Sequence, residues 1–228
     1  MDRRRPRRQR CIKRKCMPAR APAVHIGRAS VPRRAFLLSA AALAACVSTT
    51  PPDQPGDACA IFEQHDSWWS SVRRSERRWG APPALVLAII RQESGFDHNA
   101  RPARGRGFLF FPGRRPSSAL GYAQALENTW AEYERAVGDS GVDRDEFRDA
   151  ADFVAWYAGR SHAELGISFT DARAHYLAYH EGRGGYRRGT YQDNARLLAS
   201  ADRVQGYRDA YQSQLSRCEG RLNSWWPF

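Results

Sequence analysis

The sequence predicts a mainly α-helical domain, and three observations support this fold class. From residue 58 onward, apolar residues recur three and four positions apart in several segments. No segment alternates apolar and polar residues as a half-buried strand does. Proline or glycine stands at several expected helix ends. The 228 residues, 42% of them hydrophobic, suffice for one sizeable core, so we expect a single domain with a terminal tail.

The first two expected helices cover residues 58–79 and 83–94. The apolar residues at helical spacing in the first are Ile61, Trp68, Trp69, Val72 and Trp79. Gly80 is expected to end the first helix and Gly95 the second. A proline pair, including Pro83, suits the first turn of the second helix.

Residues 101–121 are rich in Arg, Gly and Pro and therefore predict a loop. Helical spacing of apolar residues returns in four later segments: 127–137, 144–165, 171–181 and 193–217. The sequence contains neither an internal repeat nor a glycine-rich phosphate loop.

The formal charge of +12 is concentrated at the start of the chain. Residues 1–45 hold 13 of the 36 Lys and Arg residues but only one of the 24 acidic residues. Clustered basic residues would indicate a nucleic-acid partner. Because both signs balance from residue 46 onward, we expect no such partner for the domain.

Residues 33–45 have the pattern of an export signal, because Arg33 and Arg34 precede an apolar stretch that is interrupted only by Ser39. The stretch is shorter than the roughly 20 residues needed to span a bilayer as a helix. A buried alanine-rich helix is the alternative, but no cap or amphipathic period accompanies it. Either the signal is extended by residues 1–30, or translation starts later, at Met17.

The end of this stretch, LAAC at residues 43–46, resembles the lipobox of bacterial lipoproteins. The resemblance implies cleavage before Cys46 and lipidation of its thiol. The paired arginines followed by Phe-Leu also resemble a twin-arginine signal, and Val47 resembles outer-membrane sorting. We therefore expect an exported protein on the periplasmic side, lipid-anchored to the outer membrane.

The expected organisation is a leader with export signal and lipobox (1–45), a tether (46–57), a domain (58–218) and a C-terminal tail (219–228). The tether is assigned because it is rich in Pro, Ser and Thr and lacks periodicity. Cys59 and Cys218 lie near the two ends of the domain. In an oxidising compartment they could form a disulfide, or remain two buried thiols.

Glu93 is the candidate for acid catalysis. It follows Val86 and Ile90 at spacings of four and three, so it shares their apolar face. Desolvation there would raise the pKa of its carboxyl and let it act as a general acid near neutrality. The alternative is a glutamate that turns back to water or pairs with an arginine such as Arg91.

Three short stretches occur in a characteristic order: ES at 93–94, GYAQ at 121–124 and AYHEG at 178–182. This order resembles the lytic murein transglycosylase family of the soluble-lytic-transglycosylase type, specifically its exported lipoprotein branch. The resemblance covers most of residues 58–218 and implies a lysozyme-like fold, with the carboxylate at a helix end facing a glycan groove. Two departures are Tyr122-Ala123 in place of Leu-Met and His180 in place of Asn.

The resemblance implies cleavage of the β-1,4 bond between N-acetylmuramic acid and N-acetylglucosamine, with formation of 1,6-anhydromuramoyl ends. Glu93 would act first as acid and then as base, without a metal or organic cofactor. The implied substrate-binding residues are Ser94, Gln124, Tyr122, Tyr179 and His180. The expected partners are peptidoglycan glycan strands, the membrane through the lipid anchor, and other cell-wall enzymes.

Several alternatives remain. The chain could be a muramidase on the same scaffold or a non-catalytic peptidoglycan-binding lipoprotein. Asp97 follows the Gly95 break, where an Asp more often forms a turn than acts in catalysis. Either Tyr176 or Tyr179 could orient Glu93, and the motif position favours Tyr179. A zinc protease is excluded because Gly184 stands where the H-E-x-x-H motif requires histidine.

Overall fold

The computed structural model describes residues 49–104 and 116–225, with the side chain of Trp225 excepted. Within these ranges it contains seven helices and no strand, apart from one isolated bridge between Leu120 and Ala125. The helices are α1 (Ala58–Gln64), α2 (Asp66–Trp79), α3 (Pro83–Ser94), α4 (Glu127–Val137), α5 (Phe147–Leu165), α6 (Ala172–Arg188) and α7 (Ala195–Trp225). The predicted mainly α fold class is confirmed.

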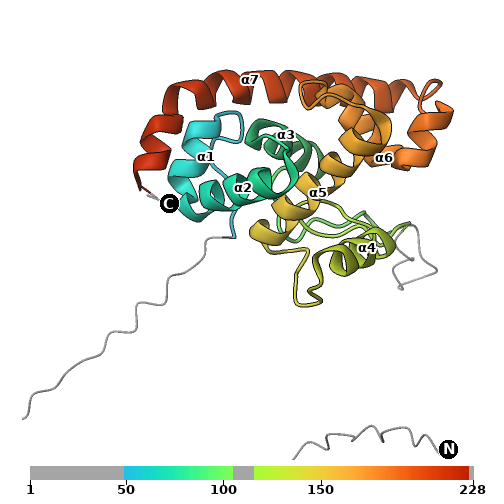
Figure 1. Cartoon of the computed structure of the whole chain (residues 1–228), viewed down its shortest axis with the longest axis horizontal. Coiled ribbons are helices and arrows are strands. Elements are labelled where there is room, and N and C mark those ends of the chain that lie inside the picture. Colours follow the sequence, from blue (N-terminus) through green and yellow to red (C-terminus); the bar gives the residue numbers. More distant parts are fainter. Residues whose placement is uncertain (1–48, 105–115, 226–228) are drawn as a thin grey trace, which may run out of the picture. The chain divides into compact units, whose positions relative to one another are not determined.

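Helix α3 lies at the centre of the core and is contacted by α2, α5, α6 and α7 (Figure 1). Every residue from Pro83 to Ile90 is buried, so α3 is enclosed on all sides rather than on one face. Its ends follow the sequence signals, with Pro83 at the first turn and Gly95 in the left-handed conformation (φ 60°) just after Ser94. Glu93 therefore occupies the last turn of a buried helix.

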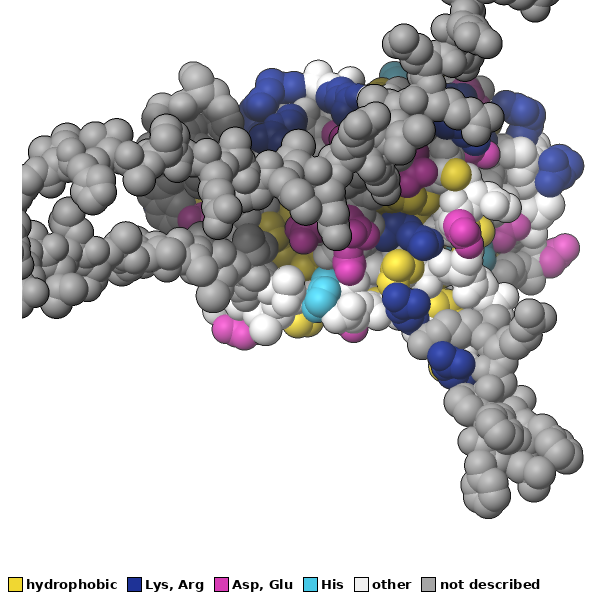
Figure 2. All heavy atoms as spheres, turned by 90° about the horizontal axis from the view of Figure 1, so that it is seen from below, with side chains coloured by type: hydrophobic (Ala, Val, Ile, Leu, Met, Phe, Trp, Pro, Cys, Tyr) yellow, Lys and Arg dark blue, Asp and Glu magenta, His cyan; other side chains and the backbone are white. Residues whose placement is uncertain are grey.

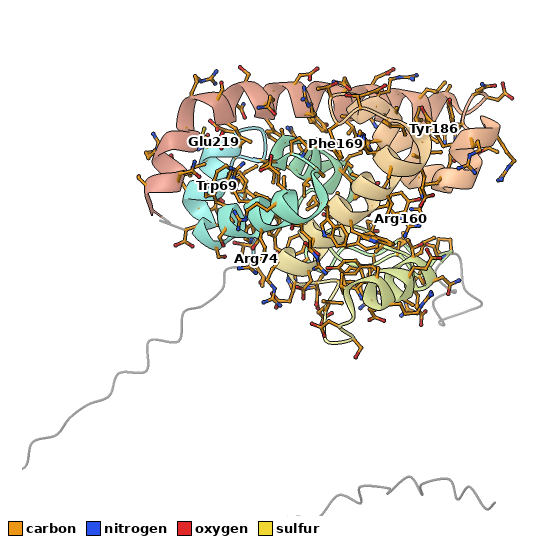
Figure 3. The ribbon with its side chains drawn as sticks, in the orientation of Figure 1. Trp69, Arg74, Arg160, Phe169, Tyr186 and Glu219 are labelled. Atoms are coloured by element: carbon orange, nitrogen blue, oxygen red, sulfur yellow. A yellow bond between two sulfur atoms is a disulfide. The ribbon has the colours of Figure 1, made fainter. Side chains whose placement is uncertain are left out.

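The long helix α7 runs along α1, α3 and α6 and joins the two ends of the domain (Figure 1). Trp69, labelled in Figure 3, connects these elements from α2. Its ring centroid lies 5.1 Å from that of Phe62 in α1, and its Nε1 donates to the Asn223 side chain in α7 over 3.1 Å. A disulfide joins Cys59 in α1 to Cys218 in α7, with 6.1 Å between the Cα atoms. The sequence allowed either a disulfide or two separate thiols, and the structure has the disulfide.

The single helix predicted over residues 58–79 was wrong, because the chain breaks at His65 (φ −126°, ψ 70°). Asp66 and Ser67 follow this break, and the Asp66 carboxylate accepts a hydrogen bond from the Ser67 amide. Asp and Ser compete for backbone hydrogen bonds in this way, so they favour helix starts over helix interiors. The His65 ring stacks on Trp68 at 4.1 Å.

The remaining helices differ from the predicted segments mainly at their ends. Helix α5 begins three residues later than predicted, and α6 continues past residue 181 to Arg188 across a non-helical residue, Gly182 (φ 73°, ψ 154°). Helix α7 extends to Trp225 and thus into residues 219–225, which the sequence analysis assigned to a C-terminal tail. Leu222 in this extension is buried.

Several sequence predictions lie outside the described residues. These are the leader with its export signal and Cys46, and most of the Arg-rich loop, residues 105–115. In the part of the chain that the structure describes, no helix is both long and apolar enough to cross a membrane. Figure 2 shows acidic and basic side chains interspersed on one face, which matches the balanced charge from residue 46 onward.

Candidate active site

A cavity of about 470 Å³ opens beside the last turn of α3. Its walls come from α3, the turn after Gly121, α4, α5 and the middle of α6. The residues that line it are Glu93, Ala119, Gln124, Ala125, Leu126, Thr129, Phe153, Tyr157, Tyr179, His180, Glu181 and Gly182. This cavity, called the Glu93 cavity below, brings together Glu93, Gln124, Tyr179 and His180 from the predicted site.

Burial raises the pKa of the Glu93 carboxyl to about 7, and a hydrogen bond from the Tyr176 side chain partly offsets this rise. The offset arises because the Tyr176 hydroxyl donates to the carboxylate and so stabilises its ionised form. Arg91, the alternative partner named from the sequence, is directed toward α7. Its guanidinium lies 3.9 Å from the Tyr207 ring centroid and donates to the Tyr211 hydroxyl over 3.4 Å. Glu93 can thus hold a proton near neutral pH.

Of the two tyrosines that the sequence offered as partners of Glu93, the structure brings Tyr176 to the carboxyl. Tyr176 is buried and hydrogen-bonds Glu93, so it is the residue that orients the carboxyl. The Tyr179 hydroxyl donates instead to the Ala123 carbonyl over 2.7 Å, although Tyr179 lines the cavity. The motif position favoured Tyr179, which joins α6 to the turn at Ala123. Tyr176, three residues earlier, contacts the Glu93 carboxyl.

The GYAQ stretch forms a tight turn that places Gln124 in the cavity wall. Gly121 has φ +73°, and a Cβ atom there would lie 2.0 Å from the Arg144 carbonyl oxygen, so only glycine fits. Gln124 itself has positive φ (47°). Its side-chain amide nitrogen donates to the carbonyls of Ala100 (2.8 Å) and Gly121 (2.9 Å). The amide thus holds the turn together, and its carbonyl oxygen remains available as an acceptor.

Aromatic rings form one wall of the cavity. Tyr179 packs edge-on against Tyr157 (5.1 Å between centroids) and Phe153 (6.2 Å). The Tyr157 hydroxyl donates to the Ala178 carbonyl over 3.1 Å and so fixes α5 against α6. Rings held in this way present rigid apolar surface with polar edges, which suits the faces and hydroxyls of a sugar.

A second carboxylate, Glu181, lines the same cavity. Hydrogen bonds from the Thr190 hydroxyl and from His180 Nδ1 (3.1 Å) lower the pKa of Glu181. In this cavity, burial raises the pKa of the Glu93 carboxyl, while hydrogen bonds lower the pKa of Glu181. Asp97, the other acid considered from the sequence, forms a turn, because its carboxylate accepts from the Asn99 amide over 2.9 Å.

Two residues predicted to bind substrate do not line the cavity. The Ser94 hydroxyl donates to the Ile90 carbonyl (3.2 Å) and accepts from the Phe96 amide (3.1 Å), so it ends α3. Tyr122 is only 2% exposed and packs edge-on against Trp68 at 5.6 Å. In the structure Ser94 terminates the helix and Tyr122 packs in the core, and their assignment to substrate binding stays a prediction.

Sequence reasoning missed several residues of the Glu93 cavity. Phe153 and Tyr157 are four residues apart on α5 and share a helix face. That spacing was the available signal, but it is equally typical of a core stripe. Glu181 stands inside the AYHEG stretch and was considered only as part of the H-E-x-x-H zinc motif, which the sequence does not complete. Among the described residues, no three His, Cys, Asp or Glu side chains cluster as a metal site.

The fold and the cavity define a helical domain with a protonatable carboxyl in an aromatic, sugar-sized cavity, as in glycan-cleaving enzymes of the lysozyme-like class. A family model described as the transglycosylase SLT domain matches residues 34–218. The chain therefore belongs to the transglycosylase SLT domain family, a lytic transglycosylase-type family of glycan-cleaving enzymes with peptidoglycan as substrate. No curated protein matches the chain.

Proposed function

We propose that this protein cleaves the β-1,4 bond between N-acetylmuramic acid and N-acetylglucosamine and leaves 1,6-anhydromuramoyl ends. The observation that carries the proposal is the position of Glu93, which ends a buried helix and lines the cavity. Burial keeps its pKa at about 7, so a large fraction carries a proton at neutral pH. A general acid works best when its pKa lies near the working pH.

The proposed reaction uses Glu93 twice. Its carboxyl donates a proton to the glycosidic oxygen, the bond from that oxygen to muramoyl C1 breaks, and the N-acetyl carbonyl of the substrate stabilises the positive charge at C1. The Glu93 carboxylate then removes the proton from the muramoyl C6 hydroxyl. The C6 oxygen bonds to C1 and closes the anhydro ring, and Glu93 has regained its proton.

The surroundings of Glu93 support both steps. Donation from Tyr176 stabilises the carboxylate that exists between the steps, while burial makes that carboxylate basic enough to accept the second proton. The aromatic rings of Phe153, Tyr157 and Tyr179 make part of the cavity wall apolar and so offer water few hydrogen-bond partners there. Fewer waters at C1 favour attack by the C6 hydroxyl over hydrolysis.

One observation favours muramidase activity as a second candidate. Glu181 is a second carboxylate in the cavity, and Thr190 and His180 lower its pKa, so it stays ionised at neutral pH. An ionised carboxylate across from a general acid can activate water. The hydrogen bonds that occupy Glu181 oppose this role, because they reduce its basicity.

Product analysis separates these two functions. Purified peptidoglycan is digested with the protein, and the soluble muropeptides are analysed by mass spectrometry. The proposal predicts muropeptides that are lighter by one water than hydrolysed ones, because the C6 oxygen replaces water at C1. Reducing ends alone would establish the muramidase. If no soluble product forms, the remaining candidate is a non-catalytic peptidoglycan-binding lipoprotein.

We further propose that the mature protein is exported and lipid-anchored through Cys46, at the outer membrane. The lipobox resemblance of residues 43–46 supports this proposal. The disulfide between Cys59 and Cys218 adds support, because disulfides persist in oxidising compartments such as the periplasm. Mass spectrometry of the cell-derived protein tests it: the expected N-terminus is an acylated Cys46, and an unmodified Met1 or Met17 would contradict it.

A further inference from the structure

A second cavity of about 360 Å³ adjoins the Glu93 cavity at Gly182. Thr129, Tyr157 and Gly182 line both cavities, and the two adjoining cavities together are called the groove below. A strand that places a glycosidic bond at Glu93 would therefore bring neighbouring groups of the same strand to the second cavity.

Two arginines distinguish the second cavity from the Glu93 cavity, which is lined by none. Glu132 comes from α4, Glu164 from α5, and Arg183 and Arg187 come from α6 beyond the Gly182 break. We call these four residues the charged subsite. The break at Gly182 makes the subsite because it redirects α6 so that this part of the helix reaches the groove.

Glu164 is already compensated within the protein. Its two carboxylate oxygens contact Arg160 Nη2 (2.6 Å) and Arg183 Nε (2.8 Å). Burial opposes its ionisation, but the two arginines outweigh burial and lower the pKa of Glu164. Arg160, labelled in Figure 3, belongs to α5 and lines neither cavity. The charge of Glu164 is therefore balanced without any ligand.

The two arginines of the subsite are not fully paired within the described part of the protein. Arg183 is held by Glu164 and by the Tyr157 ring, whose centroid lies 4.8 Å from its guanidinium carbon. Its buried Nη1 has no hydrogen-bond partner among the described residues. A buried donor without an acceptor is costly, and an anion bound nearby would lower that cost through its charge. Arg187 is exposed, and no described residue forms an ion pair with it.

We propose that the charged subsite binds a carboxylate of the peptide stem carried by the glycan strand. The inference rests on the proposed function, which places a peptidoglycan strand in the Glu93 cavity. The hydroxyl and acetamido groups of the sugars are uncharged, and the muramic lactyl group is an amide when a stem is attached. The stem therefore supplies the carboxylates, and arginine is the side chain best suited to bind them.

Equilibrium binding tests the subsite in a Glu93→Gln background. Two ligands are compared by calorimetry: a peptidoglycan tetrasaccharide whose stems carry free carboxylates, and the same compound with those carboxylates amidated. Arg187→Gln should weaken binding of the free-carboxylate ligand roughly fivefold to tenfold, since a charged hydrogen bond is lost. Binding of the amidated ligand should not change.

Two further variants control this experiment. Arg188→Gln removes the same charge from the next residue of α6, which lines neither cavity, and should leave both affinities unchanged. Glu132→Gln removes a negative charge from the subsite and should strengthen binding of the free-carboxylate ligand. Weaker binding by this variant would show that a stem ammonium, not a carboxylate, occupies the subsite.

Equal losses with both ligands in Arg187→Gln would overturn the proposal, as would failure of the free-carboxylate ligand to bind. The proposed function is tested separately by the products from whole peptidoglycan. Charge-dependent binding without cleavage would refute the enzyme activity and retain the subsite. Cleavage without charge-dependent binding would refute the subsite alone.

Discussion

The chemistry proposed for Glu93 depends on how strongly its surroundings oppose ionisation. Burial raises its pKa from 4.5 to about 7, and donation from Tyr176 acts in the opposite direction. The rate of glycan cleavage should accordingly fall as pH rises through about 7, because the acid loses its proton. Tyr176 is a positioning residue, since it acts on substrate through Glu93.

Replacing Tyr176 by phenylalanine should move the falling limb of the pH–rate profile to higher pH. The variant removes the donor that stabilises ionised Glu93, so the pKa of Glu93 rises further. Initial cleavage rates across pH measure this shift. Tyr207→Phe, on α7 beside Arg91, is the matched control and should keep the wild-type profile. A profile that falls in height without moving would assign Tyr176 a purely structural role.

Glu93 should also reduce stability at neutral pH. The folded protein retains the Glu93 proton between pH 4.5 and about 7, where the unfolded chain has lost it, so the free energy of unfolding decreases as pH rises through this window. The unfolding free energy of Glu93→Gln minus that of wild type should increase by on the order of 3 kcal/mol as pH rises through this window. Urea unfolding at pH 4 and pH 8 measures the difference. A stability gap that does not change with pH would show that Glu93 ionises freely in the folded state.

Helix α6 illustrates how one element positions the site. Tyr176 and Tyr179 precede Gly182, and the arginines of the charged subsite follow it. Gly182 has φ 73° and ψ 154°, a conformation open essentially to glycine alone. Nothing lies within 4 Å of a Cβ atom built there, so backbone strain and not crowding makes glycine necessary.

Gly182→Ala should lower the free energy of unfolding by about 1–3 kcal/mol. It should also weaken glycan binding, because Gly182 lines both parts of the groove. Gly206→Ala in α7 is the control, since a Cβ there also meets nothing within 4 Å and the position lies within a helix. Alanine should stabilise that helix by roughly 0.5–1 kcal/mol. Equal effects of the two substitutions would contradict the conformational argument.

The sequence predicted elements best where local signals end a helix. Proline, glycine and apolar spacing placed α3 at Pro83–Ser94 and α4 at Glu127–Val137, as observed. The break at His65 was missed because apolar spacing continues through it. The predicted segment ends at residue 181, just before the Gly182 break, but the sequence did not indicate that the helix continues beyond it. Local patterns do not reveal that a helix resumes after a break, since tertiary contacts decide this.

At the scale of the whole molecule, the Glu93 cavity combines segments that are far apart in the chain. The three motif stretches correctly indicated Glu93, Gln124, Tyr179 and His180 as neighbours. They did not show that Tyr122 packs into the core, because proximity in a motif does not reveal which way a side chain points. The sequence left open which tyrosine contacts Glu93 and gave Glu181 no place in the site; the packing of α6 brings Tyr176 to the carboxyl and Glu181 into the cavity wall.

The disulfide between Cys59 and Cys218 closes a loop of 159 residues around the whole core. Because such a long loop restricts the unfolded chain strongly, its removal should cost about 2–5 kcal/mol of unfolding free energy. Urea unfolding of the Cys59→Ser/Cys218→Ser double variant measures this cost. A reducing agent should destabilise wild type by a similar amount and leave the double variant unchanged. Wild type that is insensitive to reduction would contradict the prediction.

The most direct test of the account is cleavage of purified peptidoglycan by Glu93→Gln beside wild type. Glutamine preserves the size of the side chain but neither donates nor accepts the catalytic proton. Cleavage should fall by at least roughly 100-fold, while the circular dichroism spectrum and the glycan affinity should stay at wild-type level. Anhydro products formed at an undiminished rate by this variant would contradict it.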